Sequence, residues 1–285
     1  MNKKKIGIVL IIAVCMSFEI QALKFVIGTR PPGLFSNFFG VLNALRWCDG
    51  SGHTPVVYWD NVSKYYIPEG YNGSRNVWEY YFKPVSTLAY NPPDKIYRGY
   101  LAPDGRGILH KPFNCKKMLE CRFWGHGLIK KYIQPNEIVQ NKVDAFYKKY
   151  LEGKKTIGIH LRGTDKKSEV KPVAPELIFK EANKYKGYQF LVATDEERLL
   201  ALAKQSLDGP VISYDAYRSL DGKPVHRAKP HKARIGEDVV VEVLLLSRCD
   251  KFLHTCSNVS SAVMFFNPHL PHIMFLHNEL VREGM

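Results

Sequence analysis

The stretch Thr156-Ile-Gly-Ile-His-Leu-Arg-Gly-Thr-Asp165 runs from small and apolar residues into a cluster of polar and charged side chains. Such a short apolar run is typical of a buried strand in a parallel sheet, and the polar residues would then lie at its carboxyl end. Arg162 offers a planar set of N–H donors suited to a diphosphate, His160 can orient a neighbouring group, and Asp165 can hold the arginine or cap the next turn. The spacing H-x-R-x-x-D therefore marks this strand end as a candidate site.

The residues downstream of this stretch alternate between short apolar runs and amphipathic segments. We expect strands at 156–162, 188–195, 210–214, 251–255 and 272–276, and helices at 175–186, 196–207, 237–249 and 258–266. Strands that alternate with helices predict a parallel sheet covered on both faces, so the second half of the chain should be Rossmann-like.

Polar residues also follow two other predicted strands. Asp195 ends one of them, and Ser257, Ser260 and Ser261 follow another and open a predicted helix. Because the carboxyl ends of parallel strands share one edge, we expect these residues near Arg162. The serines could present backbone N–H groups to phosphate oxygens, or they could only cap the helix.

The first half begins with a β-loop-α-β pattern. A strand at 24–28 and a Gly/Pro-rich turn at 29–33 precede a predicted helix that has Ser36 as its N-cap and runs to Cys48, and a second strand follows at 55–59. The glycine-containing loop should face the same side as a ligand crevice.

Residues 61–125 are rich in Pro, Tyr, Gly and Asn, with one short helix expected at 76–82. Long connections in a compact protein often bind ligands, so we assign this stretch to acceptor recognition; an irregular, packed segment is the alternative. A helix at 135–151, ended by Gly153, closes this half, and the domain boundary is placed there.

The composition indicates a folded, basic protein of one large or two small domains. The 285 residues are 45% hydrophobic and 12% aromatic, and Lys plus Arg exceed Asp plus Glu by 41 − 27 = 14. A surplus of positive charge attracts anions such as nucleotides and phosphosugars. Since the basic residues are scattered and accompany no recognisable nucleic-acid module, we expect no nucleic-acid binding.

Residues 1–22 have the pattern of a secretory signal peptide or a short membrane anchor. Lys3–Lys5 form a basic segment, Ile6–Phe18 an apolar one, and Ala22 is a small residue at a plausible cleavage position. We therefore expect the protein in the secretory pathway or exported, with the apolar segment able to associate with a membrane. If this segment does not function, the protein is cytoplasmic.

Five cysteines lie beyond this segment. Cys115 and Cys121 are close enough in sequence for a loop disulfide, although an odd number leaves at least one thiol unpaired within the monomer. No C-x-x-C pair occurs, so a structural zinc site is not expected.

Three blocks of the sequence resemble the GDP-fucose-dependent fucosyltransferases. Ile157–Lys166 is similar to their H-x-R-R-x-D-K segment, Leu191–Asp195 to their L-A-T-D block, and Leu244–Ser261 to their L-L-S-x-C-D…S-S block. The relatives are the α1,6-fucosyltransferases of N-glycan cores, the rhizobial nodulation fucosyltransferases and, more distantly, the protein O-fucosyltransferases. The similarity is good over 156–266, faint over 24–60 and absent over 61–125.

The resemblance implies an α/β fold of the GT-B type, with two Rossmann-like domains facing a cleft. Residues 23–153 would form the acceptor-side domain and residues 154–285 the domain that binds the GDP-sugar. It also implies no metal and no cofactor, GDP-fucose being the donor substrate; consistently, the sequence contains no D-x-D motif.

The resemblance also implies roles for single residues. Arg162 would bind the β-phosphate, His160 and Asp195 the guanosine, and Ser260 or Ser261 the diphosphate. Lys166 matches one member of a proposed catalytic pair directly, whereas Glu169 matches the other only if one residue is deleted here. The nucleotide-sugar-binding set is then His160, Arg162, Asp165, Asp195, Ser257, Ser260 and Ser261, and the catalytic set is Arg162, Lys166 and Glu169.

One position departs from the family pattern, because Gly163 stands where many relatives have a second arginine. Either the small residue lets the backbone approach the sugar, or the missing charge comes from Arg218, Arg227 or Lys229.

The function implied is an inverting, metal-independent transfer of L-fucose from GDP-fucose to a hydroxyl of a glycan or glycoprotein. Inversion follows if there is a single displacement with no covalent sugar–enzyme step. Two alternatives remain open: a secreted, non-catalytic carbohydrate- or nucleotide-binding protein of the same fold, and a transferase that uses another nucleotide sugar.

Overall fold

The computed structural model describes residues 23–107, 120–163, 173–221, 231–276 and 279–282. The predicted signal segment 1–22 lies outside these ranges, as do Asp165, Lys166 and Glu169, and as do Cys115, Arg227 and Lys229. None of the helices within the described ranges combines the length and the apolar character needed to cross a membrane.

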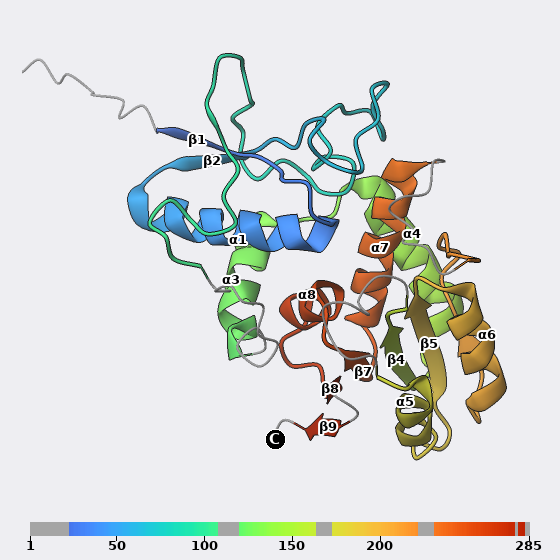
Figure 1. Ribbon diagram of the computed structural model, residues 1–285. Coiled ribbons are helices and arrows are strands. Elements are labelled where there is room, and N and C mark those ends of the chain that lie inside the picture. Colours follow the sequence, from blue (N-terminus) through green and yellow to red (C-terminus); the bar gives the residue numbers. More distant parts are fainter. Residues whose placement is uncertain (1–22, 108–119, 164–172, 222–230, 277–278, 283–285) are drawn as a thin grey trace, which may run out of the picture.

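The larger sheet has six strands in the order β6-β5-β4-β7-β8-β9, and it confirms the predicted α/β class (Figure 1). Its strands are β4 (Thr156–Leu161), β5 (Gln189–Thr194), β6 (Val211–Ile212), β7 (Lys251–Thr255), β8 (His272–Leu276) and β9 (Glu279–Arg282). The first five are parallel, as predicted. The unpredicted β9 pairs antiparallel with β8 at the edge.

Helices cover both faces of this sheet because successive side chains of a strand point to opposite sides. Ile157, Ile159 and Leu161 pack with α5 (Pro175–Ala182) and α6 (Glu197–Ser206). Leu191, Ala193, Phe252 and Met274 pack on the other face with α7 (Lys232–Leu246) and α8 (Asn258–Phe266). All six strand residues of β4 and of β5 are buried, which explains their continuous apolar sequence.

The smaller sheet has three parallel strands in the order β2-β1-β3. They are β1 (Lys24–Ile27), β2 (Thr54–Val57) and the unpredicted β3 (Ile96–Tyr97). Helix α1 (Leu34–Ser51) connects the first two. The predicted N-cap Ser36 is wrong: the N-cap of α1 is Gly33, three residues earlier, with no side-chain cap hydrogen bond. The backbone oxygen of Ser36 accepts from the Arg30 guanidinium at 3.0 Å.

The short helix predicted at 76–82 is also wrong, since turns occupy this stretch. The Asn76 side-chain oxygen accepts from the backbone N–H of Trp59 at 2.9 Å and of Trp78 at 3.2 Å, and the Trp78 ring donates to the Lys83 carbonyl at 3.0 Å. Side-chain bonds to the backbone thus replace a helical ladder.

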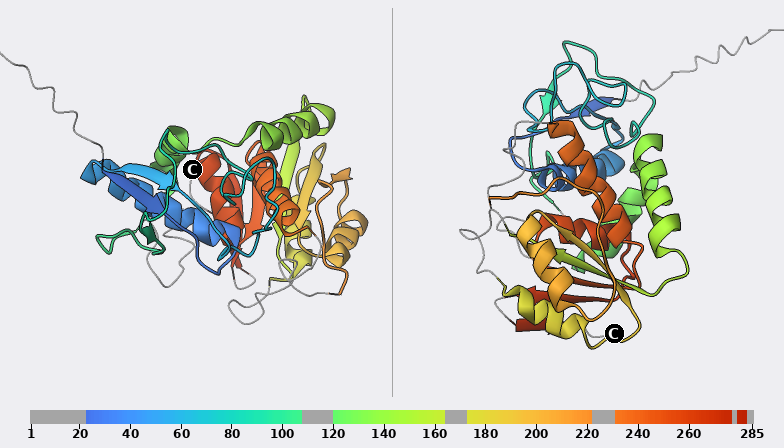
Figure 2. Two further views of the ribbon diagram at one scale, coloured as in Figure 1. Left: turned by 90° about the horizontal axis from the view of Figure 1, so that it is seen from above. Right: turned by 90° about the vertical axis from the view of Figure 1, so that its right-hand side faces the viewer.

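Along the chain, two helices follow the smaller sheet and precede the larger one. The first, α3 (Arg122–Tyr132), was not predicted from the sequence. The second, α4 (Glu137–Phe146), continues as a π-helical turn η1 (Tyr147–Leu151). The helix predicted at 135–151 is therefore confirmed, with the Asn136 side chain as its cap, accepting from Val139 N at 3.0 Å. Figure 2 shows α4 lying along α7 in both further views.

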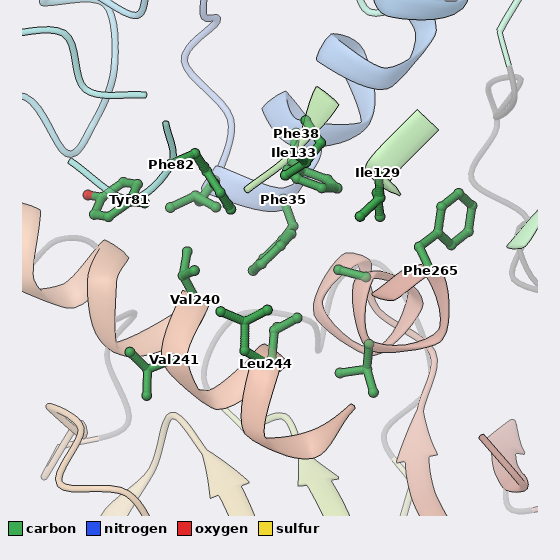
Figure 3. Close-up of a cluster of buried hydrophobic side chains, with 14 of the residues drawn as sticks. Phe35, Phe38, Tyr81, Phe82, Ile129, Ile133, Val240, Val241, Leu244 and Phe265 are labelled. Carbon is green, nitrogen blue, oxygen red and sulfur yellow. The ribbon is translucent and has the colours of Figure 1, made fainter. Parts of the chain in front are cut away.

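One hydrophobic cluster joins the two halves of the chain. Phe38 of α1 lies 5.8 Å from Phe266 at the end of α8, measured between ring centroids, and the Tyr81 hydroxyl donates to the Ala233 carbonyl at 3.0 Å. Figure 3 shows Phe35, Phe38 and Phe82 facing Val240 and Leu244 of α7. The predicted division at 153/154 falls between the sheets, but this core draws on residues from both sides of it.

Cys115 lies outside the described residues, so the loop disulfide between Cys115 and Cys121 stays a prediction. Cys48 and Cys249 are thiols, whereas Cys256 is disulfide-bonded. Burial raises the pKa of the Cys48 thiol to about 12, so this thiol is not a reactive nucleophile.

Candidate functional site

The candidate site lies where the strand order of the larger sheet changes direction. From β4 the chain moves outward through β5 to β6, then returns to place β7 on the other side of β4. In open α/β sheets ligands bind outside the carboxyl ends of strands at such a switch point. The ends of β5, β4 and β7, which carry Asp195, Arg162 and Ser257, are neighbours here, as the sequence predicted.

His160 is buried near the end of β4, with 7% of its surface exposed. On the same face its neighbours in the sheet are Ala193 and His254. The His254 ring stacks on Phe252 at 4.6 Å, and burial, helped by His272 and His160, lowers the pKa of His254 to about 3. His254 is therefore neutral at physiological pH and places no positive charge behind His160.

Arg162 and Gly163 form the turn directly after β4, and both are half-buried. One carboxylate oxygen of Asp195 accepts a hydrogen bond from the Gly163 backbone N–H at 2.8 Å. The Asp195 carbonyl accepts from the Ser219 N–H at 2.9 Å, which fixes the end of β5. Asp195 thus lies beside Arg162, and its predicted contact with guanosine stays a prediction.

The three predicted serines form the cap of α8. The Ser257 hydroxyl accepts from Ser260 N at 3.0 Å, and the Ser260 hydroxyl accepts in return from Ser257 N at 3.0 Å, which is a capping box. The Ser261 hydroxyl donates to the Ser257 carbonyl at 2.9 Å. The hydroxyls are thus engaged in capping, while the positive end of the α8 dipole is directed at the strand edge. Their predicted contact with a diphosphate stays a prediction.

A carboxylate that sequence reasoning missed, Glu242 of α7, lies close to this edge. One of its oxygens is buried and has no hydrogen-bond partner in the described part of the chain, and the Arg218 guanidinium is 3.6 Å away. Burial raises the pKa of Glu242 to about 8, the charge of Arg218 lowers it, and the charges of Asp238 and Asp195 raise it further. A lone glutamate within the apolar run Val239–Leu246 was the signal that could have identified it.

The structure bears on the two explanations for Gly163. Arg218 does not present a free charge to this turn: its guanidinium donates to the carbonyls of Tyr214 at 2.7 Å and Ala216 at 3.1 Å. A Cβ atom on Gly163 would lie 2.5 Å from Cδ of Glu196, so a larger residue here would displace the Glu196 side chain.

A second polar cluster joins α7 to the first half of the chain. The fully buried Glu237 carboxylate accepts from the Lys142 ammonium group and, at 2.9 Å, from the side-chain amide of Asn72. The next residue, Asp238, accepts from the Tyr217 N–H at 3.1 Å, and burial raises the pKa of Asp238 to about 6. These contacts position α7, and with it Glu242, relative to the tyrosine-rich loop, residues 61–107.

Within the described ranges no group of three or more His, Cys, Asp or Glu side chains is placed to hold a metal ion. The predicted catalytic residues Lys166 and Glu169, and the predicted ligand Asp165, lie outside the described residues.

The fold defined by these two sheets is shared with solved fucosyltransferases. A NodZ alpha-1,6-fucosyltransferase co-crystallised with GDP is 16% identical, with a TM-score of 0.58, over 91% of this chain and 97% of that chain. The fucosyltransferase NodZ from Bradyrhizobium gives the same identity and TM-score. A variant of Arabidopsis thaliana FUT1 in complex with GDP is 10% identical, with a TM-score of 0.52, over 92% of this chain and 71% of that chain.

These likenesses confirm the resemblance at the level of the fold. No family model and no curated protein matches the sequence.

Proposed function

We propose that this protein is an inverting, metal-independent glycosyltransferase that moves L-fucose from GDP-fucose to a hydroxyl of a glycan or glycoprotein. The observation that carries the proposal is the meeting of Arg162, Asp195 and the start of α8 at the switch point of the sheet. The fold is that of proteins crystallised with GDP, which supports the same donor here.

The diphosphate is the leaving group, so charge develops on it as the bond to the sugar breaks. Arg162 supplies a fixed positive charge with several N–H donors, and the N-terminus of α8 supplies a partial positive charge and free backbone N–H groups. Donors held in place before the reaction stabilise the developing charge without reorganisation. Both lie on strand ends that are hydrogen-bonded neighbours, which is suited to a group with two phosphates.

Glu242 supports the choice of guanine as the base. A guanine ring offers two adjacent N–H donors. Because burial raises the pKa of Glu242 to about 8, its carboxyl would lose its proton as it accepts this pair. The Glu242 oxygen that has no hydrogen bond among the described residues would gain a donor when the base binds. Uracil presents a single ring N–H and would satisfy it less well.

The acceptor hydroxyl must lose its proton, and we assign this step to Glu169, with Lys166 assisting at the donor. A carboxylate close to the hydroxyl acts as general base, and one displacement inverts the anomeric carbon. The acceptor would bind on the side of the three-stranded sheet and the 61–107 loops.

The test is ligand binding followed by transfer. GDP and GDP-fucose should raise the melting temperature and UDP should not, with a stabilisation of about 2.7 kcal/mol at a hundredfold excess over Kd. Labelled GDP-fucose with a panel of glycan acceptors should then give product, and EDTA should not reduce the rate. Equal stabilisation by UDP would exclude guanosine recognition. Binding without transfer to any acceptor would indicate a non-catalytic protein, and a requirement for metal would exclude the mechanism.

We also propose that the protein is exported or lumenal. The disulfide at Cys256 supports this location, because disulfides persist in oxidising compartments. Fractionation of the native cells with N-terminal sequencing tests it: a mature chain beginning near Leu23 supports export, and an unprocessed cytosolic chain contradicts it.

A further inference from the structure

The side chain of Glu196 occupies the space beside Gly163. A Cβ atom built on Gly163 would lie 2.5 Å from Cδ, 2.7 Å from Oε2 and 2.9 Å from Cγ of Glu196. Non-bonded atoms do not approach so closely in a packed interior, so the end of this carboxylate rests against the Gly163 α-carbon.

Glu196 is buried, and its backbone is fixed by hydrogen bonds. It is 7% exposed, and its backbone N–H donates to the Thr194 hydroxyl at 3.3 Å. On either side of it the backbone is bonded to one residue: Ser219 N donates to the Asp195 carbonyl at 2.9 Å, and Glu197 N donates to the Ser219 carbonyl at 3.1 Å. The backbone that carries the Glu196 side chain is therefore fixed on both sides.

The Glu196 carboxylate makes its closest contact with Gly163. Oε2 is buried and accepts no hydrogen bond from the described residues, and the Arg198 guanidinium lies 3.6 Å away with 80% of its side chain exposed. An exposed pair at this distance contributes little. A buried carboxylate without a hydrogen bond costs stability, so a different requirement retains it.

We propose that Glu196 is a positioning residue that fixes the Arg162–Gly163 turn by its shape. The two residues after β5 hold the turn from two directions: Asp195 binds the Gly163 N–H at 2.8 Å, and Glu196 blocks movement of the Gly163 α-carbon toward α6. A turn held in this way presents the Arg162 guanidinium in one position before the ligand arrives. The inference rests on the proposed nucleotide binding at Arg162 and adds the residue that orders it.

The proposal is tested by a double-mutant cycle on GDP affinity, measured by calorimetry at a temperature where every variant is folded. Gly163→Ala introduces the overlapping Cβ and should weaken GDP binding about tenfold, and Glu196→Ala frees the turn and should also weaken it about tenfold. In the double variant the Cβ fills the space that Glu196 leaves. Its affinity should be no lower than that of either single variant, whereas independent effects would multiply to about a hundredfold loss.

Glu196→Gln distinguishes shape from charge. The amide has the same outline, so GDP affinity should stay within about threefold of the wild type. Transfer at saturating donor should slow about tenfold in Glu196→Ala and stay unchanged in Glu196→Gln, because only the former displaces the group that stabilises the leaving diphosphate. A residue that served stability alone would leave this rate unaffected.

Two variants serve as controls. Gly127→Ala adds a Cβ that meets nothing within 4 Å, and Arg198→Ala removes the exposed partner of Glu196; both should bind GDP as the wild type does. Additive losses in the cycle, or a loss in Glu196→Gln equal to that in Glu196→Ala, would overturn the proposal. If the wild type binds no GDP, the proposed function fails. In that case the same double-mutant cycle is measured on the free energy of urea unfolding of the ligand-free proteins. Additive changes in this free energy would show that Glu196 and Gly163 do not interact.

Discussion

The two sheets differ in how much of their packing each can supply alone. The larger sheet has strands of five and six residues at its centre, and its α5–α6 face has a hydrophobic cluster drawn wholly from residues 157–275. The smaller sheet has strands of four, four and two residues, and its core is shared with α7 and α8 of the other half. The α5–α6 face of the second half therefore packs without the first half, whereas the core of the first half is shared with α7 and α8.

Phe38→Ala tests this dependence. Phe38 is fully buried and contacts the rings of Phe82 and Phe266, so we expect a loss of about 3–5 kcal/mol in the free energy of unfolding, measured in urea. Hydrogen exchange should speed up in β1, α1 and α8 together.

Phe179→Ala in the α5–α6 cluster is the matched variant, because Phe179 is 2% exposed and belongs to the second half alone. Its faster exchange should be confined to the larger sheet and its helices. If exchange in Phe38→Ala rises only in the first half, the two cores are independent and the comparison fails.

Arg162→Ala tests whether the chemistry belongs to the second half. Removal of one preorganised donor should slow transfer by about 10²–10³, or about 2.7–4 kcal/mol, and should weaken GDP binding. The measurement is kcat and KM for GDP-fucose beside calorimetry with GDP. The exposed Lys148 of the first half, which lies outside the 61–107 loops, provides the control, since Lys148→Ala should change neither quantity. Normal turnover in Arg162→Ala would place the site elsewhere.

Glu242→Gln examines the helix that faces both halves. Burial raises the pKa of Glu242 from 4.5 to about 8, so the folded state favours the protonated form. Relative to the neutral variant, the wild type should lose stability as the pH rises from 4.5 to 8, by about 1–3 kcal/mol. Urea unfolding of both proteins at pH 5 and pH 8.5 measures the difference. A gap that stays constant with pH would mean that Glu242 titrates normally.

Substitution of Asn72, at the polar contact between the two halves of the chain, should have the smallest effect on stability. Its side-chain amide donates to the Tyr80 carbonyl and to Glu237, both at 2.9 Å, and its φ of 50° lies in the left-handed region. Asn72→Gly should cost about 1 kcal/mol for the lost hydrogen bonds, and Asn72→Ala about 1 kcal/mol more for backbone strain. Equal unfolding free energies for the two variants would show that strain plays no part.

Predictions from the sequence were more accurate for the second half of the chain than for the first half. In the second half, buried strands and amphipathic helices have local periodicity, so β7, α8 and β8 were predicted to the residue and Asp195 was placed beside Arg162. In the first half, Asn76 and the surrounding aromatic side chains determine the backbone through contacts distant in sequence, which periodicity does not report.

Two relations in the site were not predicted from the sequence, also because they join residues distant in the chain. Glu242 was missed because its position depends on how α7 crosses the sheet. Glu196, the side chain that packs against Gly163, lies 33 positions further along the chain. Neither relation is local, so neither has a signature in the residues adjacent to the motif.

The hydrogen bonds of Asn72 also determine where sugar can be attached to this protein. N-linked glycans are joined to the side-chain nitrogen of Asn-x-Ser/Thr, and Asn72-Gly-Ser has this pattern. That nitrogen uses its hydrogens inside the fold, on Tyr80 and Glu237. A glycan there would remove one of these bonds and separate the tyrosine-rich loop from α7. If the chain enters the secretory pathway, Asn61-Val-Ser, whose asparagine is exposed, is an acceptor compatible with the folded chain.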